Sequence, residues 1–374
     1  MNFVVSSSEL NKHLQSVSRV INSKNTLPIL DNFVFELSDN KLIITGSDLE
    51  TTVITYIELD NIEGSGKIAL EARKLLDILK EFPEQPLTFN INEETLATDL
   101  ITETGKFSIV GQSAEDYPVV PELGADGIDI NVTSDVVLSG IEKTLFATAN
   151  DELRPVMNGI FVEMESGKIT FVASDSHKLV RYIRTDVEVS QSASFILPKK
   201  SASLMKGLLS KDESAVSLSF DEKNARFTIN EYTIICRLIE GNYPSYNSVI
   251  PTEMPNKLLV DRVTLFTALK RVTVFSNQAS YLVKLKVTPN ELIVSAKDVD
   301  FASSGVERAN CHYDGDEMEI GFKGTFLQEI LSNMSSSDVI VQLSDPSRAA
   351  ILVPSETEND SEDVLMLIMP MMLN

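Results

Sequence analysis

Three adjacent residues, Asp175, Ser176 and His177, have the side-chain types of an acyl-transfer triad. Neighbouring residues at one strand end cannot supply a nucleophile, a base and an orienting carboxylate in the geometry that this chemistry needs. Related segments at residues 47–50 and 297–300 keep the aspartate but have neither serine nor histidine at the two positions that follow it. A catalytic set is not expected to disappear from sister segments, so these residues predict a protein that is not an enzyme.

The other reactive residues form no recognisable site either. Histidine occurs only at His13, His177 and His312, without the HxxxH or HExxH spacing of a metal site. The cysteines, Cys236 and Cys311, lie in different thirds of the chain without CxxC spacing, which is typical of a protein of the reducing cytoplasm. There is no GxGxxG, GxxxxGKS or GxxxxGKT loop for a nucleotide. We therefore expect no metal and no cofactor.

The composition is that of a soluble globular protein with more than one domain. The chain has 374 residues, of which 43% are hydrophobic and 23% charged, enough for two or three separate cores. Only Phe3, Val4 and Val5 are apolar at the N-terminus, and Pro370 interrupts the longest apolar run, so we expect neither a signal peptide nor a membrane span. The net charge of −23 by itself argues against a nucleic-acid partner.

Internal repetition is the most informative feature of the sequence. Three kinds of residue recur with a period of about 125 residues: an aspartate after an apolar segment, a basic residue after a short apolar strand, and a proline. The three sets are Asp48, Asp175 and Asp298; Arg73, Lys199 and Lys323; and Pro118, Pro244 and Pro370. The repeats predict three similar domains, at residues 1–125, 126–252 and 253–374.

Each repeat has the same order of predicted elements. An amphipathic helix comes first, then strands, a second helix and further strands, which is an α+β arrangement with antiparallel sheets. Ser6 and Glu9 have the spacing of a capping box, which indicates a helix start. The predicted helices cover residues 7–24, 71–80, 134–149, 198–211, 261–276 and 323–334.

Charge is divided unevenly between these elements. The six predicted helices sum to +8, so the remainder of the chain carries −31. One explanation is that Lys and Arg are good helix formers and accumulate there for that reason. The other is that the helices form a basic layer that faces an anionic partner.

Several segments, in order along the whole chain, resemble the beta subunit of bacterial DNA polymerase III, the DNA sliding clamps. They are MNFVVSSSELNKHLQSVSRVI at the start, NTLPILDNFVFEL, GSDLE, EARKLL, ASDSHKLV, RLIEGNYPSYNSVIP, DEMEIGF and LIMPMML near the end. The resemblance implies three topologically alike domains per chain and a head-to-tail homodimer that closes a ring of six. Helices would line the hole and sheets would form the outer layer, so the basic helices would face DNA.

The implied function is that of a processivity factor. It would encircle double-stranded DNA without sequence specificity and tether the replicative polymerase and repair proteins. Since the chain has no nucleotide loop, a separate ATP-driven clamp loader would be needed. The alternative from another class is an acidic, non-catalytic protein-interaction scaffold unrelated to clamps.

The resemblance also assigns site residues. DNA-facing candidates sit where the family carries or tolerates basic residues: Lys24, Arg73, Lys74, Lys199 and Lys200. Lys12 and Arg19 are weaker candidates, and Asp151 stands where the family often has a polar DNA contact. The dimer interface would pair Phe107 and Ile109 with Val274 and Phe275 of the other chain.

A groove for short partner peptides is implied between the second and third domains, closed by the C-terminal tail. Its residues would be Met157, Ser174, Ser176, His177, Lys178, Leu179, Pro244, Val249, Pro346, Ile368, Met369, Pro370, Met371 and Met372. Methionines suit a groove that accepts different peptides, because their flexible side chains can repack. The chain departs from many relatives at Lys178, Ser248 and Met372, where arginine is frequent.

Overall fold

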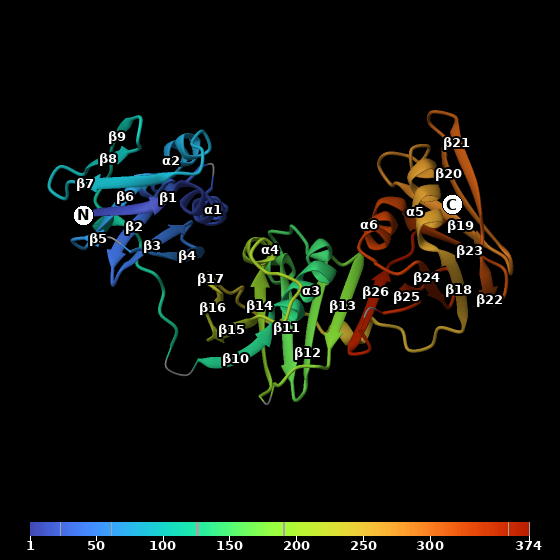
Figure 1. The fold of residues 1–374 in the computed structure, drawn as a ribbon. Coiled ribbons are helices and arrows are strands. Elements are labelled where there is room, and N and C mark those ends of the chain that lie inside the picture. Colours follow the sequence, from blue (N-terminus) through green and yellow to red (C-terminus); the bar gives the residue numbers. More distant parts are fainter. Residues whose placement is uncertain (23, 61, 125–126, 190, 358, 374) are drawn as a thin grey trace. The chain divides into compact units, whose positions relative to one another are not determined.

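The computed structural model describes residues 1–374 except 23, 61, 125–126, 190, 358 and 374 (Figure 1). The chain divides into two compact units, which are described separately below. Unit 1 comprises Met1–Leu138 and Lys200–Leu238, and unit 2 comprises Ser139–Lys199 and Ile239–Asn374. The strands of the middle repeat are shared between the sheets of the two units. The expected boundary between the first and second repeats, at residues 125 and 126, lies outside the described part of the chain.

Unit 1 contains two antiparallel sheets. The five-stranded sheet has the order β5 (Ile62–Glu63), β1 (Asn2–Ser6), β7 (Pro86–Ile91), β8 (Ala97–Ile101) and β9 (Lys106–Val110). The eight-stranded sheet has the order β10 (Ile128–Thr133), β15 (Ala215–Phe220), β16 (Asn224–Ile229), β17 (Tyr232–Arg237), β4 (Thr51–Glu58), β3 (Lys41–Ser47), β2 (Asn32–Ser38) and β6 (Gly66–Glu71). Helices α1 (Ser7–Ser18) and α2 (Ala72–Leu79) pack against each other, and α1 also packs against β3 and β4.

Unit 2 has the same kind of architecture. Its nine-stranded sheet has the order β14 (Ala193–Pro198), β11 (Gly159–Glu165), β12 (Lys168–Ser174), β13 (Lys178–Arg184), β26 (Glu362–Ile368), β25 (Ala350–Pro354), β24 (Asp338–Leu343), β18 (Asn256–Asp261) and β22 (His312–Asp314). Its four-stranded sheet has the order β21 (Ser303–Asn310), β20 (Glu291–Asp298), β19 (Leu282–Val287) and β23 (Met318–Lys323). Helices α5 (Arg262–Thr273) and α6 (Gly324–Ser332) pack together, and α5 lies against β20 and β21.

The remaining helices are α3 (Ser134–Thr144) and α4 (Lys199–Lys206), and short 3-10 turns connect other elements. These turns are η1 (Pro28–Asp31), η2 (Ala114–Asp116), η3 (Leu145–Ala147), η4 (Pro155–Asn158) and η5 (Tyr246–Val249). No helix in the described residues is both long and apolar enough to span a membrane.

The six predicted helices are confirmed, although each is shorter than its predicted range. At the first helix, the hydroxyl of Ser6 accepts a hydrogen bond from the backbone N–H of Glu9 at 3.2 Å, as an N-cap should. Leu10, Leu14 and Val17 are buried on one face of α1, as the spacing predicted. A Cβ on Gly46 of β3 would lie 2.7 Å from the Val17 side chain, so the missing side chain permits this close approach of helix to sheet.

Two sequence predictions about the repeats are wrong. Each repeat begins with a strand (β1, β10 or β18) and not with a helix, because each of these short segments pairs in a sheet before the helix starts. The proline anchor is also not a structural repeat. Pro370 follows the last residue of β26 by two positions, whereas Pro118 and Pro244 follow the ends of β9 and β17 by eight and seven positions.

The aspartate anchor is confirmed as one turn built three times. A carboxylate oxygen of Asp48 accepts the N–H groups of Glu50 and Thr51, at 3.0 and 2.7 Å. Asp175 does the same for the two residues His177 and Lys178, both at 2.9 Å. Asp298 binds the N–H groups of residues 300 and 301 in this way. An aspartate that bonds the backbone two residues ahead fixes a tight turn, which explains its recurrence.

Candidate functional site

The predicted groove residues gather around the pairing of β13 with β26 in unit 2. Lys178 lies opposite Ile368 in this antiparallel ladder, and the N–H of Met369 donates to the carbonyl of His177 at 2.8 Å. The turn of the second repeat is thereby joined to the start of the C-terminal tail. Farther on, Met371 forms an isolated bridge with Gly321 of β23.

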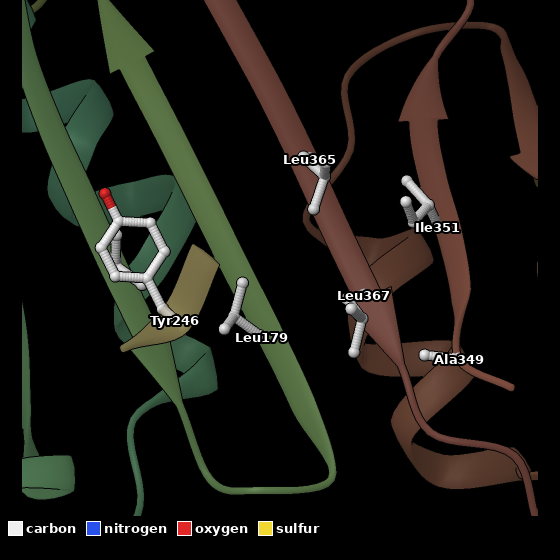
Figure 2. Packing of buried hydrophobic residues seen from close by; sticks show 7 residues of the cluster. Leu179, Tyr246, Ala349, Ile351, Leu365 and Leu367 are labelled. Atoms are coloured by element: carbon white, nitrogen blue, oxygen red, sulfur yellow. The ribbon is translucent and has the colours of Figure 1, made fainter. Parts of the chain in front are cut away.

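We call the pairing of a strand of one repeat with a strand of the next a seam; here it is the pairing of β13 with β26. An apolar cluster lies along this seam (Figure 2). It contains one residue of β13, two residues of β26 and four from adjoining segments. The members are Val172, Leu179, Tyr246, Ala349, Ile351, Leu365 and Leu367. Leu179 was predicted from the sequence, and the nearby Val249 at the end of η5 is exposed. Apolar residues of β13, β26 and η5 therefore meet where a groove was expected.

The other predicted groove residues fall into three classes of exposure. Met157, Ser174, Lys178, Leu179 and Ile368 are buried, and Pro370 and Met371 are partly buried. Ser176, His177, Pro244, Val249, Pro346, Met369 and Met372 are exposed. The hydroxyl of Ser176 lies 3.7 Å from the sulfur of Met157, so these two residues are in contact. The set combines a buried base with an exposed rim, which suits reversible binding of a partner segment.

Lys178 is buried and held by two carboxylates. Its ammonium lies 2.6 Å from Asp175 and 3.0 Å from Glu329, and 4.4 Å from the ring centre of Phe326. Burial would raise the pKa of Asp175, but hydrogen bonds from the Lys178 ammonium and from backbone N–H groups outweigh it, and the pKa lies below its ordinary value. Asp175 thus stays ionised and keeps Lys178 in place.

Beside this turn lies an open polar cavity of about 540 Å³. His177, Lys178, Arg154 and Glu329 contribute to its walls, whereas no member of the apolar cluster does. Asp151, where the resemblance implied a polar DNA contact, binds Arg154 at 2.8 Å. Its carboxylate also accepts backbone N–H groups of its own loop. Asp151 therefore organises this loop and orients Arg154.

Sequence reasoning missed the aromatic residues of the groove. Phe161 stacks on Tyr243 with ring centres 4.9 Å apart, and Tyr246 donates to a carboxylate oxygen of Glu163 at 2.6 Å. Burial and this carboxylate raise the pKa of Tyr246 to about 12, so the phenol remains a donor. Phe326 lies beneath His177 with ring centres 5.7 Å apart. The NYPSY segment offered a signal for Tyr243 and Tyr246 alone, since aromatic side chains line several kinds of peptide-binding groove.

The basic residues predicted to face DNA differ in their surroundings. Lys24 and Arg73 are exposed, and Lys74 is exposed and forms an ion pair with Glu71 at 3.1 Å. Lys199, at the start of α4, is partly exposed and donates to the side chain of Asn150 at 3.3 Å. Arg73, Lys74 and Lys199 lie on helices, as the charge count indicated. Lys24 does not, because α1 ends at Ser18, six residues before it, and the helix predicted over residues 7–24 stops short of it.

Lys200 is tied into unit 1 by three contacts. Its ammonium donates to the buried carboxylate of Asp48, to the side chain of Asn22 at 2.7 Å and to the carbonyl of Val20 at 2.8 Å. An ammonium has only three hydrogens, and these partners use them all. A phosphate contact at Lys200 would have to displace one of these partners. Lys200 therefore holds the Asp48 turn in place and is a weaker candidate for a DNA contact than Lys24, Arg73, Lys74 and Lys199.

The residues predicted for the dimer interface lie near open sheet edges. Phe107 and Ile109 belong to β9, the outer strand of the five-stranded sheet of unit 1. Val274 and Phe275 follow the end of α5 in unit 2, and a Cβ on Gly305 of the edge strand β21 would lie 2.9 Å from the Phe275 ring. Phe107 is 38% and Phe275 42% exposed, which is unusual for phenylalanine.

Comparisons with known proteins identify the family and the fold of the chain. Family models of the DNA polymerase III beta subunit match three successive parts: the N-terminal domain at residues 1–121, the central domain at 131–245 and the C-terminal domain at 247–372. The beta sliding clamp of Pseudomonas putida is 29% identical over 100% of both chains, and that of Bacillus subtilis is 26% identical over 99% of both. A crystal structure of the Pseudomonas aeruginosa DNA polymerase sliding clamp matches with a TM-score of 0.93 and 26% identity over 100% of both chains. The chain belongs to the DNA polymerase III beta subunit family and is a three-domain DNA sliding clamp.

Proposed function

We propose that two copies of this chain close head to tail into a ring of six domains around duplex DNA. The observation that carries this proposal is the pair of open strand edges. In the described residues, β9 in unit 1 and β21 in unit 2 each have a partner strand on one side alone. The strand equivalent to β9 in the second repeat is β17, and the strands equivalent to β21 in the first and second repeats are β4 and β13. All three pair on both sides. Pairing β9 of one chain with β21 of another would repeat the strand pairings that join successive repeats within the chain. Two such contacts between two chains would close a ring.

The internal seams also supply a register for this contact. Thr51 pairs with Cys236, and Lys178 with Ile368, at equivalent positions after the aspartate turns. Ser303 has the same position in the third repeat, since it lies opposite Asp298 in its hairpin. Ile109 corresponds to Cys236, because each stands one position before the last paired residue of its strand, Val110 or Arg237. Ser303 would therefore face Ile109 of the other chain.

This register brings the exposed aromatic residues together. Two positions farther along, Gly305 would lie opposite Phe107 of the other chain. Phe275 covers Gly305 from the α5 side, so the two exposed phenylalanines would bury each other. Such an apolar core flanked by strand pairing is typical of a stable homodimer interface.

The distribution of charge supports DNA as the enclosed partner. A ring held on by topology needs few and weak phosphate contacts, which allows it to slide and makes base recognition unnecessary. The exposed cations Lys24 and Arg73 and the partly exposed Lys199 suit such contacts. The chain acts in this proposal without catalysis and without a cofactor, in the reducing cytoplasm, where both of its cysteines remain free thiols.

The seam groove of unit 2 is proposed as the tether for polymerase, clamp loader and repair proteins. Its buried base around Leu179 and its exposed rim at Val249 and Met369 would receive a short apolar peptide. The loader would supply the ATP-driven opening, since the sequence contains none of the nucleotide-binding loops GxGxxG, GxxxxGKS or GxxxxGKT.

The interface prediction is tested by Phe275→Asp. A carboxylate at this position would be buried against Phe107 without a cationic partner, which costs several kcal/mol and should shift the dimer to monomer at micromolar concentration. Light scattering coupled to size-exclusion chromatography measures the mass. The matched control is Val263→Asp, at an exposed residue within α5, which should remain dimeric. A dimer with Phe275→Asp would exclude this interface.

The DNA-facing prediction is tested by the triple change Lys24→Gln, Arg73→Gln and Lys199→Gln. Removing three cations should reduce the salt dependence of DNA binding by up to about 0.9 per lost phosphate contact and weaken loading, with the dimer intact. A control with the same charge change replaces three strand lysines, Lys67, Lys168 and Lys284, and should load normally. Equal loading by both triple variants would point the helices away from DNA.

The groove prediction is tested by deleting residues 369–373. The tail contributes exposed Met369 and Met372 to the rim, so its loss should reduce the affinity for a polymerase-derived peptide by about tenfold or more. The dimer should persist, because the tail bonds lie at His177 and Gly321 within unit 2. Isothermal titration calorimetry gives the affinity, and unchanged binding would remove the tail from the groove.

A further inference from the structure

A second cavity lies at the other internal seam, where β4 pairs with β17 in unit 1. Its volume is about 330 Å³, at the lower end of the range for pockets that hold a ligand. Thr52, Ile235 and Cys236 are buried residues of its lining, and Leu49 and Pro121 are exposed apolar residues beside them.

Several residues of this cavity occupy positions equivalent to those of groove residues in unit 2. Leu49 and Ser176 occupy the same turn position with φ values of +79° and +77°. The N–H of Arg237 donates to the carbonyl of Glu50 at 2.8 Å, as that of Met369 donates to His177 at 2.8 Å. Thr52 and Leu179 likewise follow the turn by the same number of residues. The repeat has therefore built the groove architecture twice.

The two versions differ in charge. Where the second seam has Met369, the first has Arg237, and Lys223 adds another exposed cation to the cavity lining. Glu50 is the one carboxylate among these lining residues, so the cavity is cationic in a chain with a net charge of −23. Burial raises the pKa of the Cys236 thiol to about 12, so it stays neutral and the buried lining stays uncharged.

Leu49 gives the cavity an apolar contact that its sister turn does not have. Its side chain is 46% exposed, and the left-handed backbone of the turn is unusual for leucine. A small or polar residue would meet the demands of the turn at lower cost, as Ser176 does. An exposed leucine at a strained position is consistent with selection for contact with a ligand.

We propose that this first-seam cavity is a second peptide site, specific for an extended segment that carries a carboxylate next to an apolar side chain. The apolar side chain would enter between Leu49 and Ile235, and the carboxylate would meet Lys223 and Arg237. The inference rests on the proposed function of the unit 2 groove, whose architecture it extends. Because the first seam carries arginine where the groove has methionine, the two sites would select different peptides and could be occupied at once.

The test uses the full chain and a fluorescein-labelled peptide with the core Glu-Leu-Val-Glu. Fluorescence anisotropy should show saturable binding, and a peptide with the core Lys-Leu-Val-Lys should not bind. The double variant Lys223→Glu, Arg237→Glu should weaken binding by about tenfold or more, since it reverses both attractive contacts. Leu49→Ala should weaken it by less, and the control Lys67→Glu, on β6, should leave it unchanged.

The tail deletion of residues 369–373 separates the two sites. Binding of the acidic peptide should survive this deletion, although binding of the polymerase-derived peptide does not. If the deletion abolishes acidic-peptide binding and the double variant retains it, the peptide occupies the unit 2 groove and the first-seam proposal is wrong, while the groove function stands. No saturable binding to the intact chain overturns the first-seam proposal as well.

Discussion

Antiparallel backbone pairing at the seams between repeats is the interaction on which the rest of this structure depends. β4 pairs with β17, and β13 with β26, so each seam is a ladder of hydrogen bonds and not a loose domain contact. This continuity explains why the chain divides into two compact units although it contains three repeats. In the described residues, β9 and β21 pair on one side only. An open strand edge with an exposed phenylalanine beside it favours aggregation unless another chain covers it.

The seams also carry the two proposed binding sites. At each internal seam an aspartate turn meets the end of a strand from the next repeat, and a bonded backbone pair fixes the two together. The same scaffold carries methionine and an apolar cluster at one seam and arginine with lysine at the other. Repetition thus supplies a common geometry, and the side chains at equivalent positions decide its chemistry. Lys200 contributes to this common geometry, because its three contacts hold the Asp48 turn in place.

Local patterns predicted much of the fold, and long-range pairing explains what they missed. The helix positions followed from apolar spacing, and the aspartate turns from a side chain bonding its own backbone. The partner of Lys200 could not be predicted, since Asp48 is 152 positions away and a charge count treats every lysine as solvated. Phe161 and Phe326 were missed for the same reason: their contacts with Tyr243 and His177 join segments that only the sheets bring together. The proline spacing wrongly predicted that Pro118, Pro244 and Pro370 are structurally equivalent, because equal spacing in sequence does not require equal positions relative to the strands.

In the proposed ring, the clamp holds DNA by enclosing it. The most direct measurement loads the dimer onto a circular plasmid with a clamp loader and ATP, raises the salt concentration, and follows retention before and after one restriction cut. Enclosure predicts that the protein stays on the circle at salt that abolishes electrostatic binding, leaves rapidly once the DNA is linear, and is retained again when both ends are blocked. An acidic interaction scaffold without a ring would dissociate from circular and linear DNA at the same rate, and that result would contradict this account.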